Sequence, residues 1–167
     1  MITVENNFLN NDHFFNMQNI IFSDEFPWYY QKFKVEEGDG NTQFTHNLVK
    51  IVGENQERKT SPFFSTVMSQ FVSEIGATTI VRAKLNFTQK TDQIIEFKPH
   101  VDDIETENTL TSIFYMNTNN GYTQIVNGNK IDSIENRLVT FSTNTLHFGT
   151  THTDIDYRAV LNIVYIK

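Results

Sequence analysis

The chain of 167 residues has 15 Phe, no Cys and a net charge of −7. An acidic chain without a long basic run argues against nucleic acid as a partner, because such binding depends on neutralising phosphates. The absence of Cys excludes disulfides and thiolate ligands, so a bound metal must be held by nitrogen and oxygen atoms.

No apolar stretch reaches membrane-spanning length, and the N-terminal segment lacks the basic flank and apolar core of a signal peptide. These features predict a soluble, cytoplasmic protein without a membrane partner, in the cytoplasm of a host cell if the chain is viral. The length suits one domain with one core, built largely from aromatic side chains.

Two helices are predicted in the first half of the chain. Asn11 or Asp12 can cap the first, which is followed by apolar residues at roughly helical spacing. The second begins near Ser61, carries a wide apolar stripe and stops at Gly76. A stripe of this width is typical of a helix that packs against a sheet.

Extended segments are predicted at residues 28–35 and 43–52, with a polar loop over residues 53–61. His46 lies in the second segment and has no acidic neighbour two residues away. We therefore interpret His46 as a hydrogen-bonded structural residue rather than a metal ligand.

Residues 79–88 are predicted to form a strand with polar and apolar side chains on opposite faces. Arg82, Lys84 and Asn86 share the polar face. That face is either solvated or turned towards the mouth of a barrel, where Arg82 and Asn86 would touch a substrate or co-substrate.

The segment 94–102 contains the sequence His-Val-Asp at its end. In a strand, residues i and i+2 point to the same face, so His100 and Asp102 would present an imidazole and a carboxylate side by side. Asp103 is the rival carboxylate, but from a regular strand it would face away from His100.

Strands are predicted next at residues 110–117 and 122–126, bounded by Asn- and Gly-rich turns. Tyr115 lies on one face of the first strand, where a half-buried packing role is the simplest interpretation. Tyr122 and Thr123 begin the second strand and are candidate neighbours of the substrate.

Two strands are predicted at residues 138–143 and 157–166, and His147 follows the first of them. Two His and one carboxylate with open positions form the ligand set that selects non-haem Fe(II) for oxygen chemistry. His152 is a rival for His147, but it lies in a loop. Arg158 is near the start of the final strand.

The order of H-x-D, a distal His and an Arg on the following strand resembles the 2-oxoglutarate- and Fe(II)-dependent oxygenases, specifically their prolyl-4-hydroxylase-like branch. The similarity continues through the strands and turns of residues 111–150. It includes the N-terminal sequences EFPWYYQ, FTH and RAKLNFT, and is closest to small members encoded by marine bacteriophages.

This resemblance implies that His100, Asp102 and His147 bind Fe(II), and that Arg158 and Tyr115 hold the C5 carboxylate of 2-oxoglutarate. It implies a dioxygenase that uses O2, converts 2-oxoglutarate to succinate and CO2, and hydroxylates a substrate. Ascorbate can stimulate such enzymes. A prolyl residue of a peptide or protein is the substrate that the branch suggests, while a free amino acid or a nucleobase stays open.

The resemblance and the strand count predict a mainly β protein, a double-stranded β-helix (jelly roll) buttressed by N-terminal helices. We expect one domain over residues 1–167, in which residues 1–78 give helical and strand support and residues 79–167 form the metal-binding core. A non-catalytic jelly-roll module, binding or viral structural, is the alternative, and a cupin-like metalloenzyme is another. The oligomeric state stays open.

Overall fold

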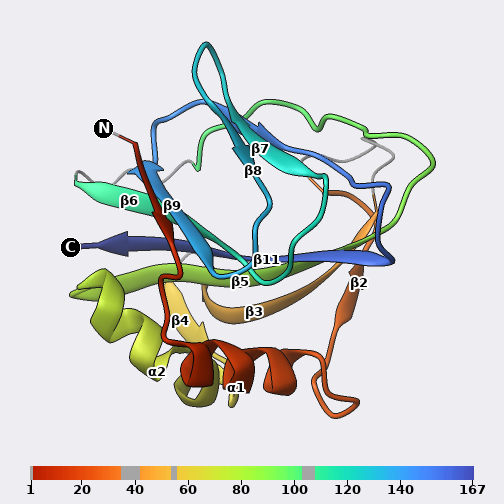
Figure 1. Ribbon diagram of the computed structural model, residues 1–167. Coiled ribbons are helices and arrows are strands. Elements are labelled where there is room, and N and C mark those ends of the chain that lie inside the picture. The colour runs from red at the N-terminus through yellow and green to blue at the C-terminus, as the bar shows by residue number, and fades with distance from the viewer. Residues whose placement is uncertain (1, 35–41, 54–55, 103–107) are drawn as a thin grey trace.

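The structure, a computed structural model, describes residues 2–34, 42–53, 56–102 and 108–167. Two helices pack on one face of a large antiparallel sheet, and a small second sheet lies over the opposite face (Figure 1). Within these ranges, neither helix is long and apolar enough to cross a membrane. The arrangement is a jelly roll with helices outside the larger sheet, as the sequence predicted.

The larger sheet contains eight strands, and every neighbouring pair is antiparallel. In spatial order they are β1 (Thr3–Asn6), β9 (Arg137–Ser142), β6 (Thr109–Tyr115), β11 (Tyr157–Ile166), β5 (Thr79–Gln89), β3 (Gln43–Val52) and β2 (Tyr29–Gln31), with β4 (Glu57–Thr60) also paired to β3.

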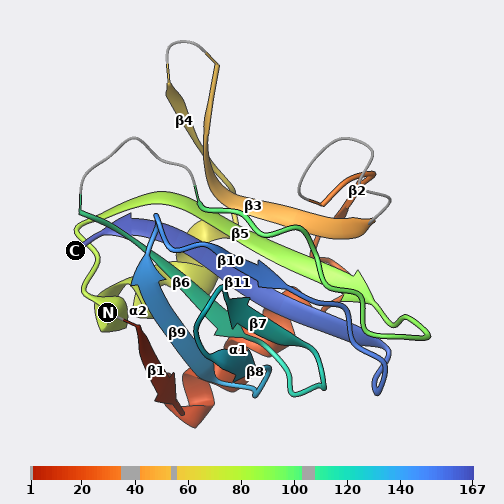
Figure 2. The same cartoon turned by 90° about the horizontal axis from the view of Figure 1, so that it is seen from above.

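The smaller sheet has three strands in the order β10 (His147–Gly149), β7 (Tyr122–Ile125) and β8 (Lys130–Asp132). The hairpin between β7 and β8 turns at Asn127, whose φ of 58° is a left-handed value that Asn tolerates better than most residues. Seen from above, this sheet lies across β6, β9 and β11 (Figure 2).

The helices are α1 (Asn11–Ile21) and α2 (Phe64–Ile75). The side chain of Asn10 caps α1 by accepting a hydrogen bond from the His13 backbone N–H, so the cap lies one residue earlier than the sequence suggested. Gly76 ends α2 with a left-handed φ of 65°, as predicted.

One face of the larger sheet packs against the helices, and the other faces the smaller sheet. Phe114 on β6 is fully buried against the helices, where its ring meets Phe71 of α2 with 5.0 Å between centroids. Burying a side chain of this size contributes roughly 1.5–3 kcal/mol. The neighbours Ile113 and Tyr115 point to the opposite face, between the two sheets. The functional residues described below lie on this inner face.

Three predicted segments differ in the structure. Within residues 28–34, the part of the first segment that the structure describes, only the short strand β2 forms. The expected polar loop contains β4, whose four exposed residues pair with β3 as a hairpin. Residues 94–102 form isolated bridges rather than a strand. Pro99 explains the last difference, because it has no N–H to donate to a ladder.

Candidate metal centre

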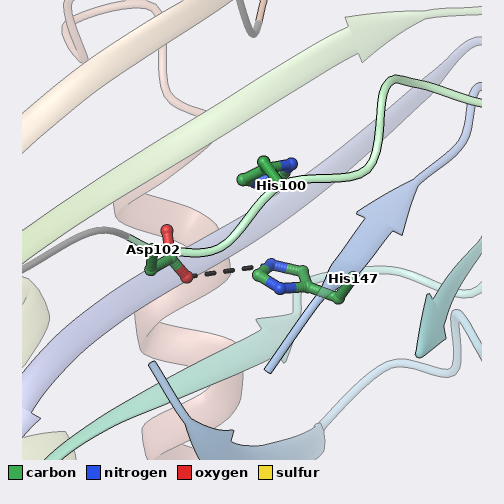
Figure 3. Close-up of side chains that lie close together, drawn as sticks. All are labelled: His100, Asp102 and His147. Atoms are coloured by element: carbon green, nitrogen blue, oxygen red, sulfur yellow. Dashed lines mark ion pairs between the residues drawn. The ribbon is translucent and has the colours of Figure 1, made fainter. Parts of the chain in front are cut away.

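His100 and His147 lie opposite each other in a single antiparallel bridge. The backbone N–H of His100 donates to the carbonyl of His147 at 2.9 Å, and the reverse hydrogen bond is 3.0 Å long. The two rings therefore project together, with centroids 4.6 Å apart (Figure 3). The local pairing with β10, not a regular strand, positions His100, the first candidate ligand.

Asp102 is fixed by a backbone hydrogen bond from its N–H to the Thr143 carbonyl, 3.1 Å away. One ligand atom from each of His100, Asp102 and His147 lies within 4.8 Å of the others. These three predicted ligands thus form a cluster of the size that a metal ion needs. Among the residues that the structure describes, this is the one such cluster.

The rival ligands lie elsewhere. His46 bonds through Nε2 to Ser61 Oγ at 2.7 Å and through Nδ1 to the Pro27 carbonyl at 2.8 Å, which fits its predicted structural role. His152 is fully buried outside the cluster. Asp103 lies outside the described residues.

The tautomers of both candidate ligand His rings are set by backbone carbonyls. Nδ1 of His147 lies 2.9 Å from the Thr145 carbonyl, and Nδ1 of His100 lies 3.2 Å from the Lys98 carbonyl. A carbonyl can only accept, so Nδ1 carries the proton in each ring and Nε2 of a neutral ring keeps its lone pair. Metal-binding His residues usually donate their other ring N–H to a carbonyl or carboxylate in this way.

Nε2 of His147 lies 3.7 Å from Oδ2 of Asp102. Burial lowers the pKa of His147, and neither its bond to Thr145 nor the nearby Asp102 reverses this effect. The ring is therefore neutral near pH 7, and two lone-pair-bearing atoms face each other. A bound cation stabilises such a pair, so the donor set fits a divalent metal.

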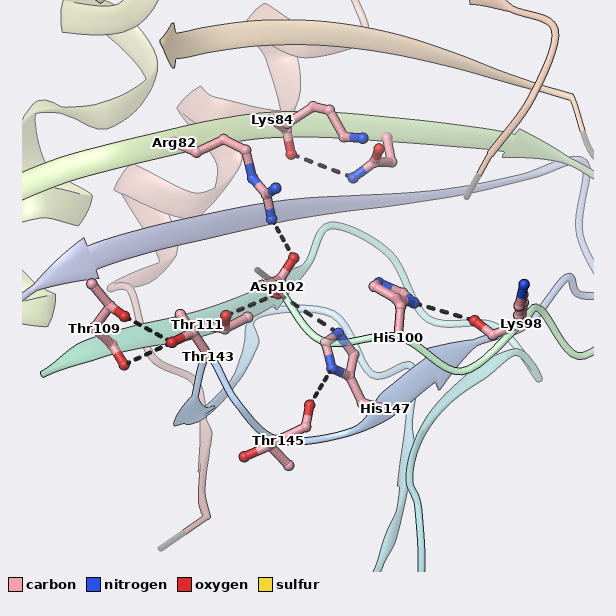
Figure 4. A network of polar contacts seen from close by, with 11 residues as sticks. Arg82, Lys84, Lys98, His100, Asp102, Thr109, Thr111, Thr143, Thr145 and His147 are labelled. Carbon is pink, nitrogen blue, oxygen red and sulfur yellow. Dashed lines mark hydrogen bonds and ion pairs between the residues drawn. The ribbon is translucent and has the colours of Figure 1, made fainter. Parts of the chain in front are cut away.

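The carboxylate of Asp102 is 4% exposed and uses both oxygens. Oδ1 pairs with the guanidinium of Arg82, and Oδ2 accepts a 2.8 Å hydrogen bond from Thr111 Oγ1 (Figure 4). Burial alone would raise the pKa of Asp102, but Arg82, followed by His147 and Thr111, lowers it overall. Asp102 is therefore a carboxylate, and its Oδ2 faces Nε2 of His147.

A cavity of about 290 Å³ opens from this cluster into the space between the sheets. Its walls include all three candidate ligands and also Arg158, which the sequence predicted to share the site. Arg158 is 4% exposed; its Nε donates to Ser133 Oγ at 3.1 Å, and its Nη2 is buried without a partner. A buried guanidinium with an unused N–H group is suited to a carboxylate ligand.

Tyr115 lies beside Arg158, whose guanidinium carbon is 5.7 Å from the centre of the tyrosine ring. The Tyr115 hydroxyl donates to Thr123 Oγ1 at 2.8 Å, and Thr123 lines the cavity. Tyr115 itself is fully buried behind this wall. Tyr115 would therefore act on a ligand in the cavity through the Thr123 hydroxyl.

The four predicted substrate neighbours have different locations. Arg82 and Asn86 both line the cavity, although Arg82 is paired with Asp102. Tyr122 lies outside the cavity-lining set, with its hydroxyl donating to Glu96 at 2.6 Å. The alternation of β7 explains this, because Thr123 faces inward and its neighbour Tyr122 must face outward.

Thr111 is a functional contact that the sequence analysis did not single out. Thr111 lies on the inner face of β6 together with Tyr115. The alternation of side chains along this strand could therefore have identified Thr111 as a residue that faces the site. What the sequence could not supply was the position of Asp102, because the bridged segment approaches β6 through tertiary contacts alone.

Thr111→Val should weaken binding of a divalent metal at this cluster by about tenfold, because loss of a hydrogen bond that orients a ligand typically costs 10- to 100-fold in metal affinity. Competition against a chromophoric chelator under anaerobic conditions measures this affinity. Ser112→Ala is the matched control, since Ser112 is also buried on β6 but bonds to Thr140 and Tyr165. Unchanged affinity in Thr111→Val would contradict an orienting role.

Comparisons with known proteins define the class of fold. No family model and no curated protein matches the sequence. Solved structures do match: an oxidoreductase of the 2OG-Fe(II) oxygenase family from Burkholderia pseudomallei has a TM-score of 0.71 and 11% identity, covering 98% of this chain and 84% of that one.

Two further matches are prolyl hydroxylases. A Pseudomonas putida prolyl-4-hydroxylase has a TM-score of 0.61 and 12% identity, with 99% of this chain and 92% of that chain covered. A Trichoplax adhaerens enzyme, solved with a peptide fragment of hypoxia inducible factor, has a TM-score of 0.61 and 13% identity, with 98% and 83% covered. The chain therefore has the jelly-roll fold found in 2OG-Fe(II) oxygenases, with a His-Asp-His cluster at the mouth.

Proposed function

We propose that this protein is an Fe(II)- and 2-oxoglutarate-dependent dioxygenase that hydroxylates an organic substrate. One observation carries the proposal: the same cavity contains a cluster of two His and one carboxylate and a buried Arg with an unused N–H group. A jelly roll alone would not support it, because this fold serves unrelated functions.

His100, Asp102 and His147 are the residues that would hold the iron. The two His rings would donate Nε2, since their Nδ1 atoms are engaged by backbone carbonyls, and Asp102 would donate Oδ2. Bound Fe(II) supplies the centre at which O2 is activated. The protein fixes the three donors in advance and keeps Asp102 ionised through Arg82.

Arg158 is the proposed partner of the C5 carboxylate of 2-oxoglutarate. Its buried position means that the pair would form away from water, where a charge-assisted hydrogen bond is about twice as strong as a neutral one. Tyr115 and Thr123 would complete this end of the cavity with hydroxyl groups. The products of the co-substrate would be succinate and CO2.

A prolyl residue of a peptide or protein is one proposed target. Support comes from the two solved prolyl hydroxylases of similar fold, one of which was captured with a peptide. The likeness to bacteriophage-encoded members stays a prediction. The choice between a peptide and a smaller substrate depends on the charges that line the cavity.

Anaerobic addition of Fe(II) and then 2-oxoglutarate should produce a metal-to-ligand absorption band in the visible region. Admission of O2, with ascorbate to keep the iron reduced, should then yield succinate slowly even without the substrate. Spectrophotometry and mass spectrometry of the products measure the two effects. If neither band nor succinate appears while Fe(II) remains bound, the protein is a jelly-roll binding module and the proposal fails.

A further inference from the structure

The cavity wall formed by β5 and β11 carries polar groups that the proposed iron and co-substrate sites do not use. Lys84 and Asn162 pair directly across these strands, and both line the cavity. Asn162 Oδ1 is buried without a partner, as is Nε of the neighbouring Arg82. The Lys84 ammonium makes no hydrogen bond or ion pair with any residue in the described part of the chain.

Lys84 is separated from the position proposed for the C5 carboxylate. Its partner Asn162 lies four residues beyond Arg158 on β11, and a strand rises about 3.3 Å per residue, so the two positions are roughly 13 Å apart along the strand. Arg82 lies one step further on the same face of β5. The cavity therefore contains two distinct cationic positions that could receive an anion.

The charges of the described lining residues are unbalanced. Four cationic side chains line the cavity, and Asp102 is the one carboxylate among these residues. The cations are Lys34, Arg82, Lys84 and Arg158. Asp102 is taken by Arg82, and the C5 carboxylate of 2-oxoglutarate would be taken by Arg158. Iron would add further positive charge, so Lys84 is left without an anion.

Partial burial of the Lys84 ammonium is costly: burial, followed by repulsion from Arg82, lowers the pKa of Lys84, and attraction from Asp102 does not reverse this shift. An oxyanion placed against Lys84 would remove this cost. A group with an N–H or O–H on the same molecule could donate to Asn162 Oδ1. The two side chains together fit a ligand that has both an oxyanion and a hydrogen-bond donor.

We propose that the molecule oxidised by this protein carries a carboxylate or phosphate group that binds Lys84, with Asn162 accepting a hydrogen bond from the same molecule. This inference rests on the proposed function and narrows it. A free amino acid or a small phosphorylated compound fits the cavity of about 290 Å³, whereas a neutral prolyl segment leaves Lys84 unpaired.

The test is calorimetric titration of the protein, first loaded anaerobically with Fe(II) and saturating 2-oxoglutarate so that Arg158 is occupied. The probes are propionate, its neutral isostere propionamide, and inorganic phosphate. Propionate or phosphate should bind at one site and propionamide should not. The stronger of the two anions identifies the oxyanion of the substrate.

Lys84→Met should weaken binding of that anion by about tenfold or more, as expected when one partner of a buried charge pair is removed. It should leave the affinity for 2-oxoglutarate unchanged. Lys50→Met is the matched control, because it removes the same charge from an exposed position on β3 outside this cavity. Lys84→Arg keeps the charge and should retain anion binding, which separates charge loss from misfolding.

The outcomes are separable. Failure of the wild type to bind 2-oxoglutarate would remove the proposed function, and this inference with it. If 2-oxoglutarate binds but neither anion does, or if Lys84→Met binds the anion as well as Lys50→Met does, the inference alone is overturned. Weaker 2-oxoglutarate binding in Lys84→Met would assign Lys84 to the co-substrate and would also overturn it.

Discussion

Asp102→Ala should abolish stoichiometric Fe(II) binding and, with it, succinate formation. Asp102 supplies the one carboxylate of the cluster, and its Oδ2 faces Nε2 of His147 at 3.7 Å. Without it, the remaining donors would be two imidazoles, and the guanidinium of Arg82 beside them repels a divalent cation. Anaerobic titration with Fe(II), followed by metal analysis after desalting, measures the loss.

The control for this variant must separate metal binding from folding, because Asp102→Ala also leaves Arg82 without its partner. Removing one member of a buried ion pair can cost about 3–5 kcal/mol, and the partial exposure of Arg82 makes the cost here smaller. The double variant Arg82→Met with Asp102→Ala should recover stability but not iron binding. Asp132→Ala, at an exposed surface pair with Lys130, should change neither property.

Iron retained by Asp102→Ala at wild-type affinity would refute the ligand assignment. Loss of iron binding in the single variant that returns in the double variant would mean that Arg82, not the carboxylate, controls the site. Either result would be visible in the metal content alone, before any activity is measured.

The sequence predicted the regular elements well where alternation and turn residues agree. β3 and β11 have the predicted bounds, because β3 is an extended run that ends before Gly53 and β11 is an almost continuous apolar run rich in β-branched residues. The second helix ends at Gly76 because its C-terminal cap needs a left-handed backbone conformation, which Gly adopts without a steric penalty. Local sequence sufficed in these places.

The site was less predictable because its geometry depends on pairings between distant segments. The i, i+2 rule placed His100 and Asp102 together, yet Pro99 prevents the regular strand on which that rule depends, and the bridge to His147 does the positioning. The pairing of Arg82 with Asp102 joins two segments whose relative placement no periodicity encodes. For these contacts the fold had to be known.

Tyr122 illustrates the same limit at the level of one strand. An aromatic residue was the natural candidate for a substrate neighbour, but the register of the β7–β8 hairpin turns Thr123 and Ile125 inward and directs the Tyr122 hydroxyl to Glu96. A shift of one residue in register would have reversed these positions. The face of the sheet to which a side chain points therefore has to be taken from the strand pairing, not from the residue type.

Arg158→Ala should raise the KM for 2-oxoglutarate by orders of magnitude while leaving Fe(II) binding nearly intact. Truncating one partner of a buried charge pair costs on the order of 2–5 kcal/mol, because the other charge is left unpaired in a low-dielectric site. Tyr115→Phe should cost less, about 0.5–1.5 kcal/mol for one hydrogen bond, since its hydroxyl reaches the cavity through Thr123.

Titration of 2-oxoglutarate into the iron-loaded variants, followed through the visible absorption band, measures these affinities directly. Arg137→Ala is a suitable control, because Arg137 is a more exposed Arg on β9 that bonds to Asn6 and to the Asp132 carbonyl. From sequence alone, Arg158 could have been a surface residue paired with Asp154 or Asp156, in which case its removal would leave the affinity unchanged. The structure instead buries it with Nε on Ser133 and Nη2 unpaired, so an unchanged affinity would show that this unused N–H group does not hold the co-substrate.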